Sequence, residues 1–221
     1  MQRIKTLMLG IAAIVLIGIG GLVYRNAVEH PNRPMTCPLE AKVCPDGTSV
    51  GRTGSTCTFP ACPPPNVELA SLGISFALPV GFEAVTGDSR VPDTMALYRT
   101  QETIPGAFDY DDIDIQLLPI SASSTASATI QENAIGGASG LPISPTRFTS
   151  TVIGRYRFTV VSIERFEGVI TTAYYLSRAT DVIRFTAIDR GVDWTNPSLI
   201  VSNLPAHAGL VKLLATLQGQ Q

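Results

Sequence analysis

The sequence has few of the residues that catalysis most often uses. It contains only two histidines, His30 and His207, and no Gly-x-Ser-x-Gly nucleophile elbow. Ser139 has no candidate base nearby in sequence, and the Gly136-Gly137 pair lacks the lysine of a phosphate-binding loop. We expect His207 to be a half-packed or exposed helix residue. These absences predict a protein that is not an enzyme and has no cofactor, with an unrecognised hydrolase as an alternative.

The chain also lacks an excess of positive charge. It has 16 basic and 18 acidic residues, a net charge of −2. Three of the basic residues and one of the acidic residues precede His30, so the remainder has 13 basic and 17 acidic residues and a charge of −4. No basic patch is interleaved with aromatic residues. Because binding to phosphate backbones depends on positive charge, we expect no nucleic-acid partner.

One long uncharged apolar run, Leu7–Tyr24, lies near the N-terminus. Arg3 and Lys5 precede it, and Arg25 follows it. Eighteen residues at 1.5 Å each span about 27 Å, close to the hydrocarbon core of a bilayer. The run is longer than most signal-peptide cores, and the residues after it make a poor cleavage site. We therefore predict a single-pass anchor in the cell membrane, with the C-terminal part outside the cytoplasm; a cleaved signal peptide is the alternative.

All four cysteines lie close together behind a polar, proline-bearing stalk over residues 25–36. They are Cys37, Cys44, Cys57 and Cys62, with the spacing C-x6-C-x12-C-x4-C. An even number of clustered cysteines outside the cytoplasm predicts two disulfides, and three connectivities are possible. A zinc site is the alternative, but its usual C-x2-C knuckles are missing.

The stretch Cys44–Pro63 reads CPDGTSVGRTGSTCTFPACP. It resembles a short four-cysteine module that recurs in envelope proteins of small-genome bacteria and that implies no known function. A weaker likeness to Kazal-type protease inhibitors rests on Val43-Cys44, Asp46-Gly47 and Cys57, but that family has six cysteines. It implies a protease inhibitor with Arg52 as an exposed binding tip. The simpler interpretation makes Arg52 a solvated turn residue.

The remaining chain predicts a β-rich domain behind a proline spacer. Gly73–Pro79 alternates as a strand, and Ala206–Leu217 has leucines at helical spacing, with Asn203 as its expected cap. A second, short helix is expected at Thr125–Asn133. Short turns between consecutive strands predict an antiparallel meander whose apolar face is covered by the C-terminal helix. Other predicted strands are Met95–Arg99, Ile113–Pro119, Phe148–Ile153, Tyr156–Glu164, Val169–Ser177 and Val182–Asp189.

These features predict an α+β protein. The strand and Pro-x-Gly-Phe corner at Ile74–Phe82, with the closing helix, resemble the PsbP/Mog1-type fold. That resemblance implies a binding or scaffolding role toward another envelope protein or a small ligand. The expected parts are a cytoplasmic N-terminus (1–6), a transmembrane helix (7–24), a stalk (25–36), a disulfide-rich module (37–62), a Pro-rich linker (63–71) and an antiparallel α+β domain (72–221).

One acidic cluster could bind a metal ion. Asp109, Asp111, Asp112 and Asp114 lie within six residues, and carboxylates of this kind can bind Ca²⁺. The glycine and the later glutamate of an EF-hand loop are absent. The alternative is an acidic loop that leads into a strand, with Asp112 and Asp114 on its wet face.

Overall fold

The computed structural model describes residues 2–29, 37–45, 47–86, 94–101, 110–136, 140–166 and 168–219. It divides into two units, Met1–Glu40 with Gly51–Phe59 and Ala41–Val50 with Pro60–Gln221, and we describe each by itself. His30 and most of the predicted stalk lie outside the described residues, as do Asp46, Asp109 and Ser139.

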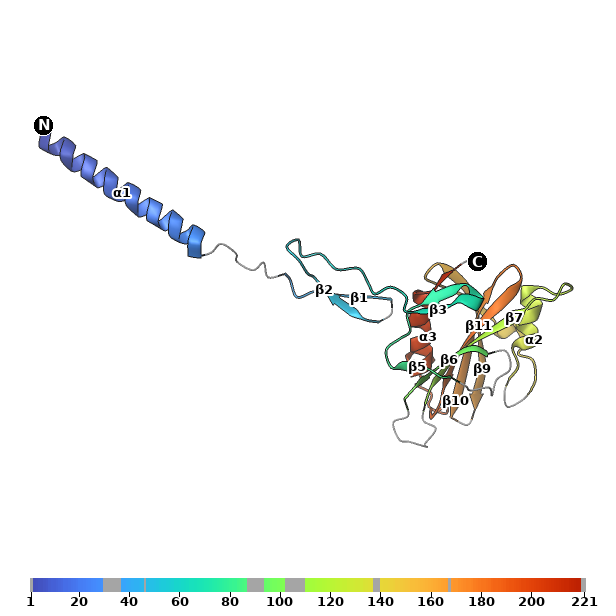
Figure 1. Ribbon diagram of the computed structural model, residues 1–221. Coiled ribbons are helices and arrows are strands. Elements are labelled where there is room, and N and C mark those ends of the chain that lie inside the picture. The colour runs from blue at the N-terminus through green and yellow to red at the C-terminus, as the bar shows by residue number, and fades with distance from the viewer. Residues whose placement is uncertain are drawn as a thin grey trace. The chain divides into compact units, whose positions relative to one another are not determined.

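The first unit begins with helix α1, Gln2–Glu29 (Figure 1). Among the residues that the structure describes, no helix is long and apolar enough to cross a membrane. This finding corrects the prediction of a transmembrane helix at Leu7–Tyr24.

Both predicted disulfides are confirmed, and the structure selects their connectivity. Cys37 pairs with Cys57 in the first unit, with Cα atoms 5.3 Å apart. Cys44 pairs with Cys62 in the second unit, with Cα atoms 5.6 Å apart. The order is therefore first to third and second to fourth, and all four cysteines are oxidised. Strands β1 (Ala41–Val43) and β2 (Ser49–Gly51) pair in a two-stranded sheet.

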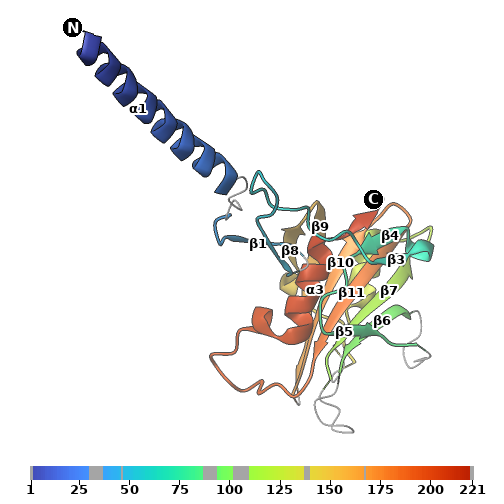
Figure 2. The same cartoon turned by 60° about the vertical axis from the view of Figure 1, so that its left-hand side comes forward.

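The second unit contains a seven-stranded antiparallel sheet in the order β5-β6-β7-β11-β10-β9-β8 (Figure 2). Its last four strands in sequence are consecutive antiparallel neighbours, which confirms the predicted meander. Its strands are β5 (Phe82–Ala84), β6 (Thr94–Thr100), β7 (Asp112–Pro119), β8 (Thr149–Ile153), β9 (Tyr156–Phe166), β10 (Val169–Ser177) and β11 (Asp181–Asp189).

A smaller sheet has the order β12-β4-β3. β4 is Ile74–Phe76, within the predicted strand, and β12 is Gln218–Gly219. β3, Val67–Leu69, lies within the segment expected to be a linker. The three strands bring the start of the domain next to its C-terminal end.

Helix α3, Pro205–Ala215, covers one face of the large sheet. Its leucines pack against inward residues of the central strands such as Ile113 and Phe185. The side chain of Asn203 does not cap the helix. Asp189, at the end of β11, instead accepts a hydrogen bond of 2.6 Å from the backbone N–H of Ala206. A buried carboxylate from the sheet thus holds the positive end of the helix.

The opposite face is also covered, by helix α2, Ala126–Asn133, and the segment after it. Thr125 caps α2 through its side chain, which accepts from the N–H of Ala128 at 3.2 Å. Ile130, Ala134 and Ile143 pack on this face of the sheet. Figure 1 shows α2 and α3 on opposite sides of the strands. The fold is mostly β-sheet, which corrects the α+β prediction, and neither face of the sheet is fully wet.

We predict that Gly209→Ala destabilises the domain. Alanine normally favours a helix by about 1 kcal/mol over glycine. Here a Cβ atom would lie 2.7 Å from the buried Phe82 ring, and overpacking of this kind typically costs about 1–3 kcal/mol. Urea unfolding should therefore show a net loss of roughly 1 kcal/mol. In a Phe82→Leu background the same substitution should be neutral or stabilising. A gain in stability from Gly209→Ala alone would contradict this packing.

Candidate ligand-binding site

The central strands carry polar side chains on the face that lies away from α3. In the registers of β7 with β11 and of β11 with β10, Gln116, Arg184 and Tyr175 form one row across the sheet. Asp114 and Thr186 belong to the next row. Directly opposite residues in an antiparallel pair share a face, so these five side chains are neighbours. We call them the polar face.

Four residues of the polar face are buried, and the fifth, Arg184, is half-buried. Tyr175 is 0% exposed, Thr186 is 2% exposed and Asp114 is 5% exposed. The predicted wet face for Asp112 and Asp114 is therefore wrong, because segments outside the strands cover this side of the sheet as well. Buried positions of this kind are normally filled by apolar side chains or by fully paired polar ones.

Three atoms of the polar face are buried without a hydrogen-bond partner: Tyr175 Oη, Arg184 Nε and Thr186 Oγ1. The guanidinium of Arg184 donates from Nη1 to Gln116 Oε1 at 3.4 Å, and its carbon lies 5.8 Å from the Tyr175 ring centroid. A buried polar group left unpaired costs about 1–3 kcal/mol. Three such atoms at neighbouring positions of β10 and β11 therefore lower the stability of the folded protein at this place.

Asp114 is the titratable carboxyl group of this face. Burial raises its pKa to about 6, while the hydrogen bond from Thr94 and the positive charge of Arg184 oppose the rise. The hydroxyl of Thr94 lies 3.1 Å from Asp114 Oδ1. The nearby Asp112 raises the pKa further. Asp114 therefore changes charge slightly below neutral pH. Perturbed carboxyl groups of this kind are concentrated at functional sites.

Asp112, two residues earlier on β7, lies in a paired charge cluster. Its Oδ1 accepts from Arg99 Nε at 2.7 Å, and its Oδ2 accepts from Arg190 Nη1 at 2.9 Å. Both guanidinium groups stack on the Tyr110 ring, at 3.9 and 4.8 Å from its centroid. Asp111 Oδ1 accepts from the backbone N–H of Arg190 at 2.9 Å. The negative charge of Asp112 is thus neutralised within the fold.

These contacts bear on the calcium hypothesis. Asp111 and Asp112 already accept N–H donors, Asp114 is bonded to Thr94, and Asp109 lies outside the described residues. Within the described part of the chain, no three side chains of His, Cys, Asp or Glu are placed to hold a metal ion. The hypothesis stays a prediction without support from this geometry.

His207 lies on α3, on the far side of the sheet from the polar face. Its Nε2 is 2.8 Å from Tyr174 Oη, and its buried Nδ1 has no partner. Burial lowers the pKa of the imidazole, so it is neutral at physiological pH. This geometry gives His207 a tyrosine partner and agrees with the expectation of a half-packed helix residue.

The side chain of Arg52 is about one-third exposed and is held by contacts within the first unit. Its Nε and Nη2 donate to Glu40 Oε2 at 2.9 and 2.7 Å, and its Nη1 donates to the carbonyl of Cys57 at 3.0 Å. Its guanidinium carbon also lies 4.3 Å from the Phe59 ring centroid. The side chain thus ties together the loop that the Cys37–Cys57 disulfide closes. The inhibitor hypothesis stays a prediction.

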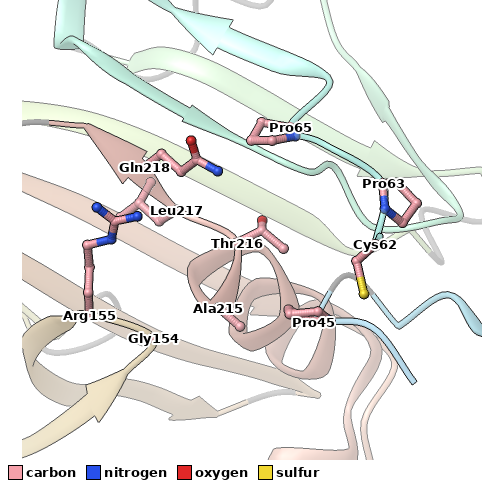
Figure 3. Close-up of a pocket in the computed structure, with 10 residues that line it drawn as sticks. All are labelled: Pro45, Cys62, Pro63, Pro65, Gly154, Arg155, Ala215, Thr216, Leu217 and Gln218. Atoms are coloured by element: carbon pink, nitrogen blue, oxygen red, sulfur yellow. The ribbon is translucent and has the colours of Figure 1, made fainter. Parts of the chain in front are cut away.

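Two surface pockets lie elsewhere on the second unit. One, of about 270 Å³, is lined by prolines, the end of α3 and Arg155 (Figure 3). The other, of about 280 Å³, lies between Phe82 and Lys212. Figure 3 shows the side chains of Arg155 and Gln218 on the same side of the first pocket. None of the buried unpaired atoms belongs to a residue that lines either pocket, so the polar face is the stronger candidate.

The sequence contained a signal for this site that strand assignment alone does not use. Arg184 and Thr186 interrupt the apolar residues of Val182–Asp189, and both fall on the same face of the strand. Period-two alternation predicts that face to be wet. Only the covering segments reveal that it is buried and that its polar atoms therefore lack water.

Comparisons with known proteins add no identity. No family model matches the chain, and no curated protein matches it. A crystal structure from Bacteroides thetaiotaomicron VPI-5482 aligns with a TM-score of 0.41 and 12% sequence identity. The alignment covers 67% of this chain and 46% of the other, so this chain spans less than half of that protein. A likeness this distant supports no inference about fold or function, and the PsbP/Mog1 resemblance stays a prediction.

We predict that Asp114→Asn stabilises the protein at neutral pH. The folded-state pKa of about 6 exceeds the ordinary value of 3.8, so the folded protein binds more protons than the unfolded chain between these values. The contribution of Asp114 to the free energy of unfolding is fully present below about pH 4 and is lost as the pH rises through about 6. The loss approaches about 3 kcal/mol at pH 7. Urea unfolding of the protein near pH 4.5 and near pH 7.5 measures this loss of unfolding free energy.

The Asp114→Asn variant should gain about 1–3 kcal/mol of unfolding free energy near pH 7.5 and less near pH 4.5. Burial also raises the pKa of Asp189 to about 6, so part of the pH slope will remain. Glu68→Gln is the control, since it removes an exposed carboxylate on another strand. An unchanged slope, or a loss of stability near pH 7.5, would contradict the assignment to Asp114.

Proposed function

We propose that this is a binding protein of an oxidising compartment outside the cytoplasm, and that its β domain holds a small polar ligand on the polar face. The observation that carries the proposal is the group of three buried, unpaired atoms on Tyr175, Arg184 and Thr186. The cysteines support this choice of compartment, because both pairs are oxidised and disulfides persist in oxidising surroundings.

Binding fits these side chains better than catalysis does. Tyr175 on β10 and Arg184 and Thr186 on β11 offer hydrogen bonds from fixed positions on two neighbouring strands. The polar face includes no histidine or cysteine, and the described histidine His207 packs on the opposite side of the sheet. Asp114 titrates near neutral pH but is bonded to a threonine rather than to a paired acid, base or nucleophile.

Access to the buried hydroxyls of Tyr175 and Thr186 requires the packing around them to open. Ile130 of α2, with Ala134, Ile143 and Phe148, packs against the apolar residues on this side of the sheet and against Tyr175. α2 has eight residues, of which only Thr129 and Ile130 are buried, so it is a weakly held element. In the closed arrangement the three unmade hydrogen bonds cost about 1–3 kcal/mol each. A ligand that makes them regains that free energy and offsets the opening of this packing.

The test is a thermal-shift screen of the full chain against millimolar amino acids, dicarboxylates, sugars, sugar phosphates and nucleosides. We expect at least one compound class to raise the melting temperature by about 2 °C or more, as binding to the folded state alone requires. Arg184→Met should abolish the shift, because it removes the central donor of the face.

Arg155→Met is the matched control, since it removes an arginine from the pocket of Figure 3 and leaves the polar face intact. It should retain the shift. No shift with any compound would overturn the proposal. A shift lost in Arg155→Met and kept in Arg184→Met would place the ligand in the other pocket and overturn it equally.

A further inference from the structure

We infer that the ligand of the polar face carries an anionic oxygen, of the carboxylate or phosphate type, and that Arg184 Nε, Tyr175 Oη and Thr186 Oγ1 bind it. This inference rests on the proposed function and specifies its ligand. It depends on which donor and acceptor atoms of the polar face already have a hydrogen-bond partner and which have none.

The three atoms of the polar face that lack a hydrogen-bond partner can all act as donors. The Nε–H of Arg184 can only donate, and both hydroxyls can donate. The carbonyl oxygen of Gln116 already accepts from Arg184 Nη1, and Asp114 Oδ1 already accepts from Thr94. A ligand rich in acceptors can pair with all three atoms, whereas a ligand that offers only donors would leave the Nε–H of Arg184 unpaired. The positive charge of Arg184 favours an anionic acceptor over a neutral one.

The three donors belong to residues at neighbouring positions on one face of the sheet. Arg184 is directly opposite Tyr175, and Thr186 follows Arg184 by two residues on the same face of β11. Neighbours of this kind are about 5–7 Å apart at their backbones. Ala173, opposite Thr186, is fully buried and contributes only a methyl group. The bond from Gln116 holds one end of the guanidinium and leaves Nε–H for the ligand.

The charges around the site favour the anion when Asp114 is protonated. Asp114 is opposite Thr186 and faces Arg184, so its carboxylate would repel a bound anion. The other acidic group that acts on it is Asp112, which Arg99 and Arg190 neutralise. Since burial raises the pKa of Asp114 to about 6, anion binding should tighten as the pH falls through that value.

The experiment titrates the full chain with acetate, with inorganic phosphate and with acetamide, the uncharged analogue of acetate. Binding is followed by the melting temperature and by the NMR signal of the Arg184 Nε–H. Near pH 5.5 we expect acetate or phosphate to bind about tenfold or more tightly than acetamide. Whichever of acetate and phosphate binds more tightly identifies the class of the anion. Near pH 7.5 the preferred anion should bind several-fold more weakly, and Asp114→Asn should restore the affinity.

Two conservative variants should fold normally, so that a loss of anion binding in them is not caused by misfolding. Tyr175→Phe and Thr186→Val each remove one buried unpaired hydroxyl, so they should leave stability without anion unchanged or raised. Each should still weaken anion binding by about threefold or more, since one hydrogen bond is lost. Anion binding that survives in Arg184→Met would place the anion elsewhere and overturn the inference.

The inference and the proposed function can fail separately. If a neutral compound from the screen binds in an Arg184-dependent way while acetate and phosphate show no advantage over acetamide, the anion assignment is overturned and the binding function stands. If neither the anions nor any compound of the screen binds, both are overturned.

Discussion

The pairing of β7 with β11 is the interaction on which the rest of the domain depends. Its register joins Asp112–Pro119 to Asp181–Ile188 at the centre of the sheet. Because side chains alternate along a strand, this one register directs isoleucine and phenylalanine toward α3 and carboxylate and guanidinium toward the opposite face. A slip by one residue would exchange the two sets and place charges beneath α3. The candidate site and the main core are thus two results of the same backbone pairing.

The same pairing also positions α3. Asp189 ends β11, and its carboxylate accepts from the first turn of the helix 17 residues later in the chain. The residue before the helix, Leu204, has no side-chain acceptor, so a cap from the sheet replaces a local one. Burial of this carboxylate raises its pKa, as it does for Asp114. Both carboxyl groups oppose stability at neutral pH, but Asp189 has its partner in the helix, whereas Asp114 faces atoms that are unpaired.

The local features of the chain were predictable because they depend on residues near each other in sequence. Cysteine clustering predicted the two disulfides, short turns predicted the meander, and leucine spacing predicted the helix at the C-terminus. Predictions that needed long-range information were less successful. The α+β class with a transmembrane helix at Leu7–Tyr24 was corrected, and the expected cap of α3 was found elsewhere. Arg52, expected in a turn, is held by Glu40 twelve residues earlier.

By itself the sequence determined the oxidised cysteines, the strand pattern and the covering helix, since each follows from spacing along the chain. Tertiary structure alone decided the disulfide connectivity, the capping of α3 and the composition of the polar face. Arg184 and Thr186 look like ordinary wet-face residues in the sequence. They become a candidate site only because Thr186 Oγ1 and Arg184 Nε are buried in the assembled fold and have no hydrogen-bond partner there. The physical reason is that an unpaired polar atom is significant only where water is excluded, and burial is a property of the assembled fold.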